Sequence, residues 1–285
     1  MAALAERFTE RAVLLGRDSS LVSIVTRPAA SQSGDRPAIV ILNTGIIHRV
    51  GHHRMYVTLS RELARTGHTV VRFDFSGIGD SAPAKDPMPP LAACLEQIGD
   101  VIDSIARTYD ITRFVLVGLC SGADHAILYS HNDARVVGLV LMDPTLPPTF
   151  RYYCHYVLQR LLHARNWRSV VTGRSGLMRM LATHLVHRLR NRENSAELTL
   201  QSLQFSPRLV QCYRAAARRN VNILAVFTSV SARHTYPRQI IDAFPEIGDG
   251  GSLRLEYFQQ SDHVFSPPQT RERLFSVIAD WVESV

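Results

Sequence analysis

Val115-Leu116-Val117-Gly118-Leu119-Cys120-Ser121-Gly122-Ala123-Asp124 is an apolar strand pattern that continues into Gly-x-Cys-x-Gly and then into residues compatible with a helix. This pattern is typical of the nucleophile elbow, a sharp strand-to-helix turn that exposes a reactive side chain, here a thiol in place of the usual hydroxyl. The strained turn admits only small residues two positions before and after its centre, and Gly118 and Gly122 meet that requirement around Cys120. Centring the turn on Ser121 would put a leucine where a glycine is wanted. The stretch predicts Cys120 as a nucleophile, although alone it also fits a buried cysteine in an ordinary α/β protein.

Strand and helix patterns alternate on both sides of this turn, which indicates an α/β fold with a mostly parallel central sheet and helices on both faces. Strands are expected at residues 11–15, 21–26, 38–43, 69–73, 113–117, 136–142, 221–227 and 253–258, and helices at 55–65, 91–109, 237–243 and 270–282. The strand pattern stops at residues 146–219, where the sequence is helical and rich in arginine. We expect one catalytic domain, formed by residues 1–145 and 220–285, with residues 146–219 inserted as a helical lid; 285 residues are enough for one such core.

The composition favours a reducing compartment. The amino-terminal residues lack the apolar run of a signal peptide and no stretch of about 18 apolar residues occurs, so we expect a cytoplasmic protein without stable membrane insertion. The four cysteines are widely spaced, without a Cys-x-x-Cys pair, which argues against zinc and against a disulfide framework. They are Cys94, Cys120, Cys154 and Cys212. No cofactor is expected.

A cysteine nucleophile needs a base, because a free thiol has a pKa of about 8.5. In the chain order that goes with a nucleophile elbow, the histidine comes last, on a loop after the final strand. Ser261-Asp262-His263-Val264-Phe265 occupies that place, and His263 is the one histidine of twelve that does. The sequence therefore predicts His263 as the general base, against the alternative of a histidine on a surface loop.

The acid that would orient the histidine is missing from its usual place, because residues 227–234 contain no carboxylate. The end of the preceding strand supplies Asp143, which we expect to orient His263; the alternative is that Asp143 caps the first helix of the lid. Asp262 is too close in sequence to His263 to reach its ring comfortably. A thiol depends less on this acid than an alcohol does, because cysteine is the better acid.

Two backbone amides are expected to hold the oxyanion that forms during acyl transfer. One is the amide of Ser121, directly after the nucleophile, and the other is that of Ile46, in the glycine turn that follows the strand ending at Asn43. The next residues are rich in donors, and Arg49, His52 and Arg54 would hold a carboxylate or phosphate at the mouth of the pocket. Helix capping or exposure to solvent is the alternative role for these three.

The histidines of the same segment, His48, His52 and His53, raise the question of a metal. They lack a nearby carboxylate in the sequence, so no metal site is expected. The later stretch Asp74-Phe75-Ser76-Gly77-Ile78-Gly79-Asp80-Ser81 is a glycine-rich turn after a strand. It lacks the complete Gly-x-Gly-x-x-Gly and any Walker lysine, so a phosphate cradle is not expected there either.

These motifs together, namely Asp-x-x-Gly-x-Gly-x-Ser, Gly-x-Cys-x-Gly, a late Asp-His and an inserted lid, resemble the α/β-hydrolase superfamily over essentially the whole chain. Three shorter motifs resemble the small hydrolases associated with exosortase systems: Asn43-Thr44-Gly45, Arg49-Val50-Gly51 and Arg72-Phe73-Asp74. Two features depart from the superfamily pattern. Cysteine stands in place of serine, as in enzymes similar to dienelactone hydrolase, and the usual late acid is absent.

The net charge of +7 is concentrated in the predicted lid. Residues 146–220 contain 13 arginines and two acidic residues, a net charge of +11, whereas the remainder carries 19 basic and 23 acidic residues. We expect Arg179, Arg188 and Arg190, beside an apolar helical stripe, to receive an anionic acyl carrier such as coenzyme A or an acyl-carrier protein. Solvated arginines and reversible contact with an anionic membrane are the alternatives. Nucleic acid is not expected, because no recognition motif accompanies the charge.

The sequence thus predicts an enzyme that processes acyl thioesters, an acyltransferase or thioesterase, through an acyl-Cys120 intermediate. A thioester intermediate is attacked by amines and carbon nucleophiles more easily than an oxygen ester is. The first alternative is an ester or lactone hydrolase of the dienelactone-hydrolase type. The second is a catalytically silent scaffold, which a Cys120 sulfur far from the His263 ring would favour. The acyl group, the acceptor and the oligomeric state are not predicted.

Overall fold

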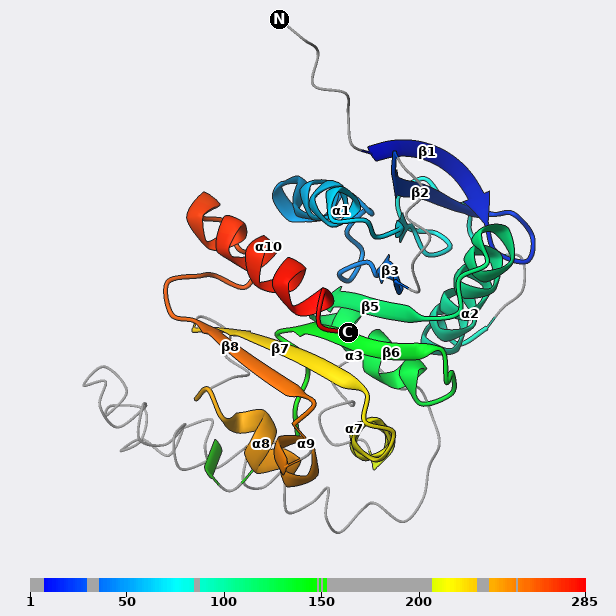
Figure 1. Ribbon diagram of the computed structural model, residues 1–285. Coiled ribbons are helices and arrows are strands. Elements are labelled where there is room, and N and C mark those ends of the chain that lie inside the picture. Colours follow the sequence, from blue (N-terminus) through cyan, green and yellow to red (C-terminus); the bar gives the residue numbers. More distant parts are fainter. Residues whose placement is uncertain are drawn as a thin grey trace, which may run out of the picture.

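The computed structural model describes residues 8–29, 36–84, 88–147, 149, 151–152, 207–229, 236–249 and 251–285. These residues contain an eight-stranded sheet in the order β1-β2-β4-β3-β5-β6-β7-β8 (Figure 1). The strands are β1 (Phe8–Leu15), β2 (Leu21–Pro28), β3 (Ala38–Ile41), β4 (Val70–Phe73), β5 (Phe114–Leu119), β6 (Val136–Met142), β7 (Asn222–Thr228) and β8 (Leu253–Phe258). β2 pairs antiparallel with β1 and with β4, and all pairs from β4 to β8 are parallel. This is the mostly parallel sheet that the sequence predicts.

Helices cover both faces of the sheet. They are η1 (His52–Arg54), α1 (Met55–Arg65), α2 (Pro90–Tyr109), α3 (Ser121–Ser130), α7 (Pro207–Arg218), α8 (Gln239–Ala243), α9 (Pro245–Asp249) and α10 (Pro268–Val282). α1 and α10 lie side by side on one face, and α2, α3 and α7 lie on the other (Figure 1). Each face therefore buries its own apolar cluster.

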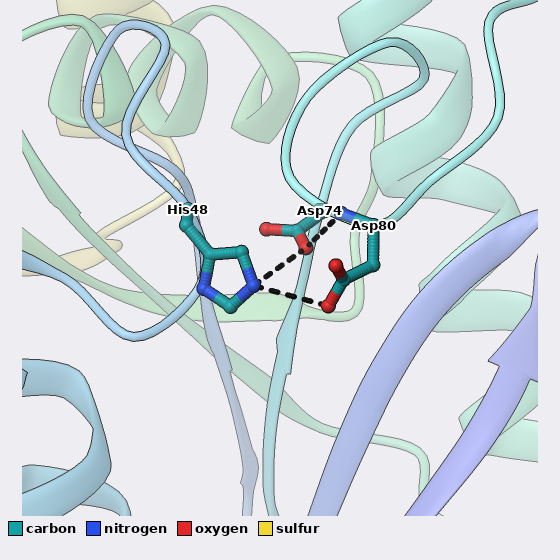
Figure 2. A group of neighbouring side chains, drawn as sticks. All are labelled: His48, Asp74 and Asp80. Atoms are coloured by element: carbon teal, nitrogen blue, oxygen red, sulfur yellow. Dashed lines mark hydrogen bonds and ion pairs between the residues drawn. The ribbon is translucent and has the colours of Figure 1, made fainter.

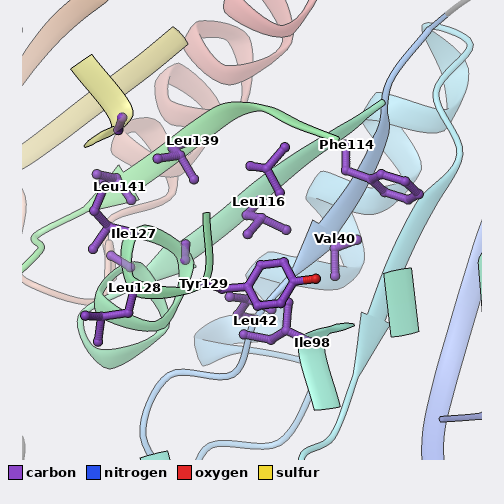
Figure 3. Packing of buried hydrophobic residues seen from close by; sticks show 14 of the residues in the cluster. Val40, Leu42, Ile98, Phe114, Leu116, Ile127, Leu128, Tyr129, Leu139 and Leu141 are labelled. Carbon is purple, nitrogen blue, oxygen red and sulfur yellow. The ribbon is translucent and has the colours of Figure 1, made fainter. Parts of the chain in front are cut away.

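Strands β5 and β6 contain only apolar residues and glycine, because both of their faces are covered. In β5, Leu116 packs with Leu139 and Ile127 on the side of α3, as Figure 3 shows, whereas Val115 and Val117 belong to the cluster under α1 and α10. Residues 114–119 are all buried. The sheet thus gives a rigid base to the turn at Cys120.

The predicted elements are found with small shifts at their ends. β1 begins three residues earlier than expected, at Phe8, and the short helix α9 was not predicted. Within the segment expected to form the lid, α7 packs against α3 and buries Leu209 and Tyr213, so this last part adds to the core layer. The residues numbered 153–206, with Arg179, Arg188 and Arg190, lie outside the described residues. Among the described helices, none is long and apolar enough to cross a membrane.

Candidate active site

Cys120 lies at the turn between β5 and α3 in a strained backbone conformation, with a positive φ of 57° and a ψ of −117°. A Cβ atom at Gly118 would lie 2.2 Å from the backbone carbon of Gly122, and one at Gly122 would lie 2.7 Å from the backbone oxygen of Asn43. Side chains cannot occupy those places, so the expected steric need for both glycines is confirmed. The turn holds the Cys120 side chain at the amino-terminal end of α3, where partial positive charge favours a thiolate.

His263 and Asp143 meet at the carboxyl ends of the parallel strands. Asp143 follows β6 and His263 follows β8, and the His263 Nδ1 donates a hydrogen bond of 2.8 Å to Asp143 Oδ2. The His263 ring is also hydrogen-bonded with the side chain of Cys120. The structure therefore brings together Cys120, His263 and Asp143, the three residues that the sequence singled out.

The buried carboxylate of Asp143 is held by Thr228, the last residue of β7. The Thr228 amide donates to Oδ1 at 2.8 Å, and the Thr228 hydroxyl donates to Oδ2 at 2.6 Å. Asp143 itself has a positive φ of 45°. Apart from its place at the end of a strand, no local pattern pointed to a role for Thr228.

A second buried carboxylate fixes the chain just beyond Asp143. Asp124, in the first turn of α3, accepts hydrogen bonds from the amide and the hydroxyl of Thr145, both at 2.7 Å. Because α3 begins at the elbow, this pair ties the Asp143 loop to the element that carries Cys120. Asp124 belongs to the elbow sequence, but that motif predicted no function for it.

The electrostatics of this group favour a protonated imidazole. The Asp143 carboxylate, followed by the Cys120 side chain, raises the pKa of His263 to about 9, against the opposing effect of burial. At neutral pH the ring is then an imidazolium, the form that pairs with a cysteine thiolate. A hydroxyl would be too weak an acid to form such a pair.

The expected oxyanion donors lie on two segments that contact each other. The Gly45 amide donates to the Ser121 hydroxyl at 2.6 Å, which brings the loop after β3 against the first residue of α3. Within the described residues no hydrogen bond occupies the Ile46 amide, and the Ile46 side chain is 87% exposed. The loop that contains Ile46 therefore contacts the first residue of α3, directly after Cys120.

The three expected substrate-binding residues of the 48–54 segment are placed differently from one another. His52 lies close enough to His263 and Asp262 for their charges to act on it, and burial is the main cause that lowers its pKa. The neighbouring His53 hydrogen-bonds with Ser266 at 3.1 Å, which joins this segment to the His263 loop. Arg54 has φ 59° at the start of α1, and its side chain is exposed.

Arg49 corrects the expectation made for it. Its guanidinium is 11% exposed, contacts Asp74 Oδ2 through Nη1, and bonds to Asp80 Oδ2 at 2.8 Å through Nη2. Its charge is therefore already paired inside the protein, and it does not face the pocket mouth as a free cation. The sequence could not show this because the two aspartates lie 25 and 31 positions further along the chain.

The same aspartates also correct the view that His48 lacks a carboxylate neighbour. His48 Nε2 lies 3.2 Å from Asp80 Oδ2 and 3.6 Å from Asp74 Oδ2, as Figure 2 shows. One ligand atom from each of these three residues lies within 4.8 Å of the others, a spacing compatible with a metal ion. The Arg49 guanidinium bonds to both carboxylates, so the cluster already holds a cation supplied by the chain.

Comparisons with known proteins identify the family and the fold of the chain. The family model described as serine aminopeptidase, S33, matches residues 35–228. None of the curated proteins compared matches the sequence. Among solved structures, a dienelactone hydrolase from Anabaena variabilis has a TM-score of 0.58 at 9% identity, over 98% of each chain. An esterase from Pyrococcus furiosus has a TM-score of 0.58 at 12% identity, over 99% of this chain and 91% of that one.

A hypothetical protein from Pseudomonas aeruginosa gives a similar result, with a TM-score of 0.57 at 16% identity over 99% of this chain and 95% of that one. Such low identities show that the fold is shared and nothing finer. The family match spans β3 to β7, which include the strands that precede Ile46, the elbow and Asp143. The chain belongs to the serine aminopeptidase S33 (Hydrolase_4) family of α/β-hydrolases.

Proposed function

We propose that the protein hydrolyses an ester or lactone, or a thioester as the sulfur analogue of an ester, through a covalent acyl-Cys120 intermediate. The observation that carries this proposal is the contact of His263 with two partners, the Asp143 carboxylate at 2.8 Å and the Cys120 side chain. A nucleophile that bonds to a base, which in turn bonds to an orienting acid, is the arrangement that acyl transfer uses. A silent scaffold has no need of it.

In the first half of the reaction the Cys120 thiolate attacks the substrate carbonyl carbon, a C–S bond forms, and the carbonyl oxygen becomes an oxyanion. The amides of Ser121 and Ile46 donate hydrogen bonds to that oxygen. When the intermediate collapses, the bond to the leaving group breaks, and the leaving oxygen or sulfur takes the proton of the His263 imidazolium. The enzyme is left as a thioester with a neutral histidine.

In the second half, neutral His263 accepts a proton from water as the water oxygen attacks the thioester carbonyl. The C–S bond then breaks, the carboxylic acid leaves as product, and the Cys120 thiolate and the His263 imidazolium are restored. Asp143 stabilises the imidazolium at both stages without taking its proton. Each proton that His263 gives in acylation is regained in deacylation.

Ester or lactone hydrolysis is preferred over the other chemistries of acyl-cysteine for two reasons. The chain belongs to a hydrolase family, and two structures with the same fold are named dienelactone hydrolase and esterase. The family description names a serine, whereas this chain has cysteine at the elbow. We expect the cysteine to favour substrates with activated carbonyls. The resemblance to exosortase-associated hydrolases stays a prediction from short motifs.

A burst experiment tests the proposal. With p-nitrophenyl acetate, we expect a rapid release of p-nitrophenol equal to the amount of enzyme, followed by a slower steady rate set by thioester hydrolysis. Cys120→Ala should show neither phase, whereas Cys212→Ala, which removes the buried thiol of α7, should keep both. A burst that survives Cys120→Ala would rule out the acyl-Cys120 intermediate.

Acyl transfer from coenzyme A or an acyl-carrier protein is the second candidate, favoured by the +11 charge of residues 146–220. Replacing Arg179, Arg188 and Arg190 together with glutamine should then raise KM for a coenzyme A thioester and leave p-nitrophenyl acetate almost unaffected. Added salt should have the same selective effect, because exposed charges are screened beyond about 10 Å at 0.1 M. An equal response of both substrates, or of neither, would remove the carrier hypothesis.

A further inference from the structure

Asp74 joins the two loops that follow β3 and β4. Its carboxylate is completely buried, and Oδ1 accepts hydrogen bonds from the Arg49 amide at 2.6 Å and from the Asn43 side chain at 3.1 Å. Oδ2 accepts a bond from the Asp80 amide at 3.2 Å. The donors come from both ends of residues 43–49, the loop that contains Ile46, which we call the oxyanion loop.

A buried carboxylate needs a compensating cation, because an unpaired charge in the interior is strongly destabilising. Arg49 supplies it, with Nη1 on Asp74 and Nη2 on Asp80 at 2.8 Å. Because Arg49 also donates its own amide to Asp74, the end of the oxyanion loop is held by both backbone and side chain. The ion pair therefore sets where this loop leaves the core.

The close approach of the two loops depends on Gly79. A Cβ atom there would lie 2.3 Å from Asp74 Oδ2 and 2.6 Å from the His48 ring, so any other residue would push the cluster apart. Gly79 also has φ 55°, which favours glycine. Figure 2 shows the side chains of His48, Asp74 and Asp80 pointing toward one another. Glycine at position 79 therefore allows Asp74 and His48 to approach each other.

The middle of the oxyanion loop is fixed by the elbow itself. The Ser121 hydroxyl accepts the Gly45 amide at 2.6 Å, and the Asn43 side chain donates to the Ile47 carbonyl at 2.8 Å. The Ile46 side chain lies between these two hydrogen bonds in the sequence and is exposed, so it does not pack in the core. The position of the Ile46 amide is therefore decided by hydrogen bonds from neighbouring residues and not by its own packing.

We propose that Arg49 and Asp74 are positioning residues that hold the Ile46 amide at the oxyanion and so act in the acylation step. This assignment rests on the proposed acyl-Cys120 chemistry. Neither side chain touches the reacting atoms; both act through the oxyanion loop, which is anchored at Arg49 by the ion pair and near Ile46 by Ser121.

Two reactions of the same thiol separate this role from a merely structural one. Acylation of Cys120 by p-nitrophenyl acetate passes through an oxyanion, whereas alkylation by iodoacetamide displaces iodide at a saturated carbon and forms none. We expect Asp74→Asn and Arg49→Gln to lower the acylation rate by about 10-fold to 100-fold, somewhat less than the loss of a whole oxyanion donor, and to leave the alkylation rate within about twofold. Arg49→Lys, which keeps the charge but not the two-pronged contact, should recover part of the rate.

The matched control is Asp133→Asn, at the far end of α3. Asp133 is also a buried carboxylate that is paired with an arginine, accepting bonds from Arg135 and, at 2.7 Å, from the Tyr129 hydroxyl. It should lower the melting temperature as Asp74→Asn does, yet leave the ratio of acylation to alkylation unchanged. An equal loss of both rates in Asp74→Asn, or the same selective loss in Asp133→Asn, would overturn the assignment.

Should Asp74→Asn fail to fold, Arg49→Gln provides the second variant, because it removes the ion pair and leaves the Asp74 carboxylate with its amide donors from Arg49 and Asp80. The same selective loss of acylation is expected, and an unchanged ratio would contradict the proposal. A wild-type protein that is alkylated at Cys120 but never acylated would instead overturn the proposed function, and this assignment with it.

Discussion

Thr228 donates two hydrogen bonds to the carboxylate of Asp143, one from its amide to Oδ1 at 2.8 Å and one from its hydroxyl to Oδ2 at 2.6 Å. Thr228 ends β7, the strand after which an orienting acid is usually expected in this chain order. In this protein the carboxylate that contacts His263 instead follows β6, and Thr228, at the end of β7, donates the hydrogen bonds that orient this carboxylate toward His263. The same oxygen, Oδ2, receives both the Thr228 hydroxyl and the His263 ring.

Thr228→Val tests this arrangement, because it keeps the shape of the side chain and removes the hydroxyl donor. We expect kcat to fall by about 3-fold to 10-fold, in line with about 1 kcal/mol for a lost hydrogen bond, while KM stays nearly constant. Steady-state kinetics on an activated ester measure the change. Thr228→Ser restores the donor and should restore the rate; a Thr228→Ser variant as slow as Thr228→Val would show that the hydroxyl is not what matters.

Asp143→Asn removes the charge that stabilises the imidazolium. Turnover should fall by at least about tenfold, equivalent to roughly 1.4 kcal/mol of transition-state stabilisation. The melting temperature should also fall, because the buried ion pair with His263 is lost. Kinetics well below the melting temperature, and thermal unfolding of the same preparation, separate the two effects. Unchanged turnover in the folded variant would remove Asp143 from the catalytic group and leave it a purely structural role at the strand end.

The pH dependence follows from the raised pKa of His263, about 9 in the folded protein against an ordinary value of 6.5. The protonated ring therefore stabilises the fold fully below about pH 6.5, and this contribution is lost as the pH rises through about 9. NMR titration of the ring should show a pair that titrates near pH 9, since the thiol and imidazole are coupled.

Asp143→Asn should move that titration to lower pH, because Asp143 is the largest of the causes that raise the pKa. The rate with an ester whose leaving group needs a proton should then decline at a correspondingly lower pH than in the wild type. A titration that stays at the same pH in Asp143→Asn would argue against the electrostatic account.

The cysteines should react with iodoacetamide at very different rates near neutral pH. Cys120 is partly exposed and paired with His263, whereas burial raises the pKa of Cys94 to about 11 and also raises that of Cys212. Cys120 should therefore be labelled first, with Cys94, Cys154 and Cys212 lagging; Cys154 lies outside the described residues. Peptide mapping after short exposure measures the order. Equal labelling of all four in the folded protein would contradict the account.

Local patterns explain why so much of the fold could be predicted. The apolar strand before Cys120 and the glycines on either side of it are local features, and the elbow follows from them by steric exclusion alone. The place of His263 followed from chain order. Asp143 was the candidate for the acid because residues 227–234 contain no carboxylate and Asp143 stands at the end of the preceding strand. Capping of the first lid helix stayed open as its alternative role.

Contacts between distant segments could not be predicted in the same way. Arg49 looked like a free cation because Asp74 and Asp80 lie on another loop, and only the pairing of β3 beside β4 brings them together. Thr228 looked like an ordinary strand residue until β6 and β7 were placed side by side. In each case the missing information was the order of strands in the sheet, which periodicity does not contain.

The central claim is a covalent acyl group on Cys120, and mass spectrometry of the protein after brief mixing with an activated ester, or with a panel of acyl thioesters, tests it most directly. Peptide mapping should place the added acyl mass on the peptide that contains Cys120, and hydroxylamine at neutral pH should release it, as expected of a thioester. Cys120→Ala should carry no acyl group. An acyl group found instead on Ser121, or on no residue while the substrate is still consumed, would contradict the account.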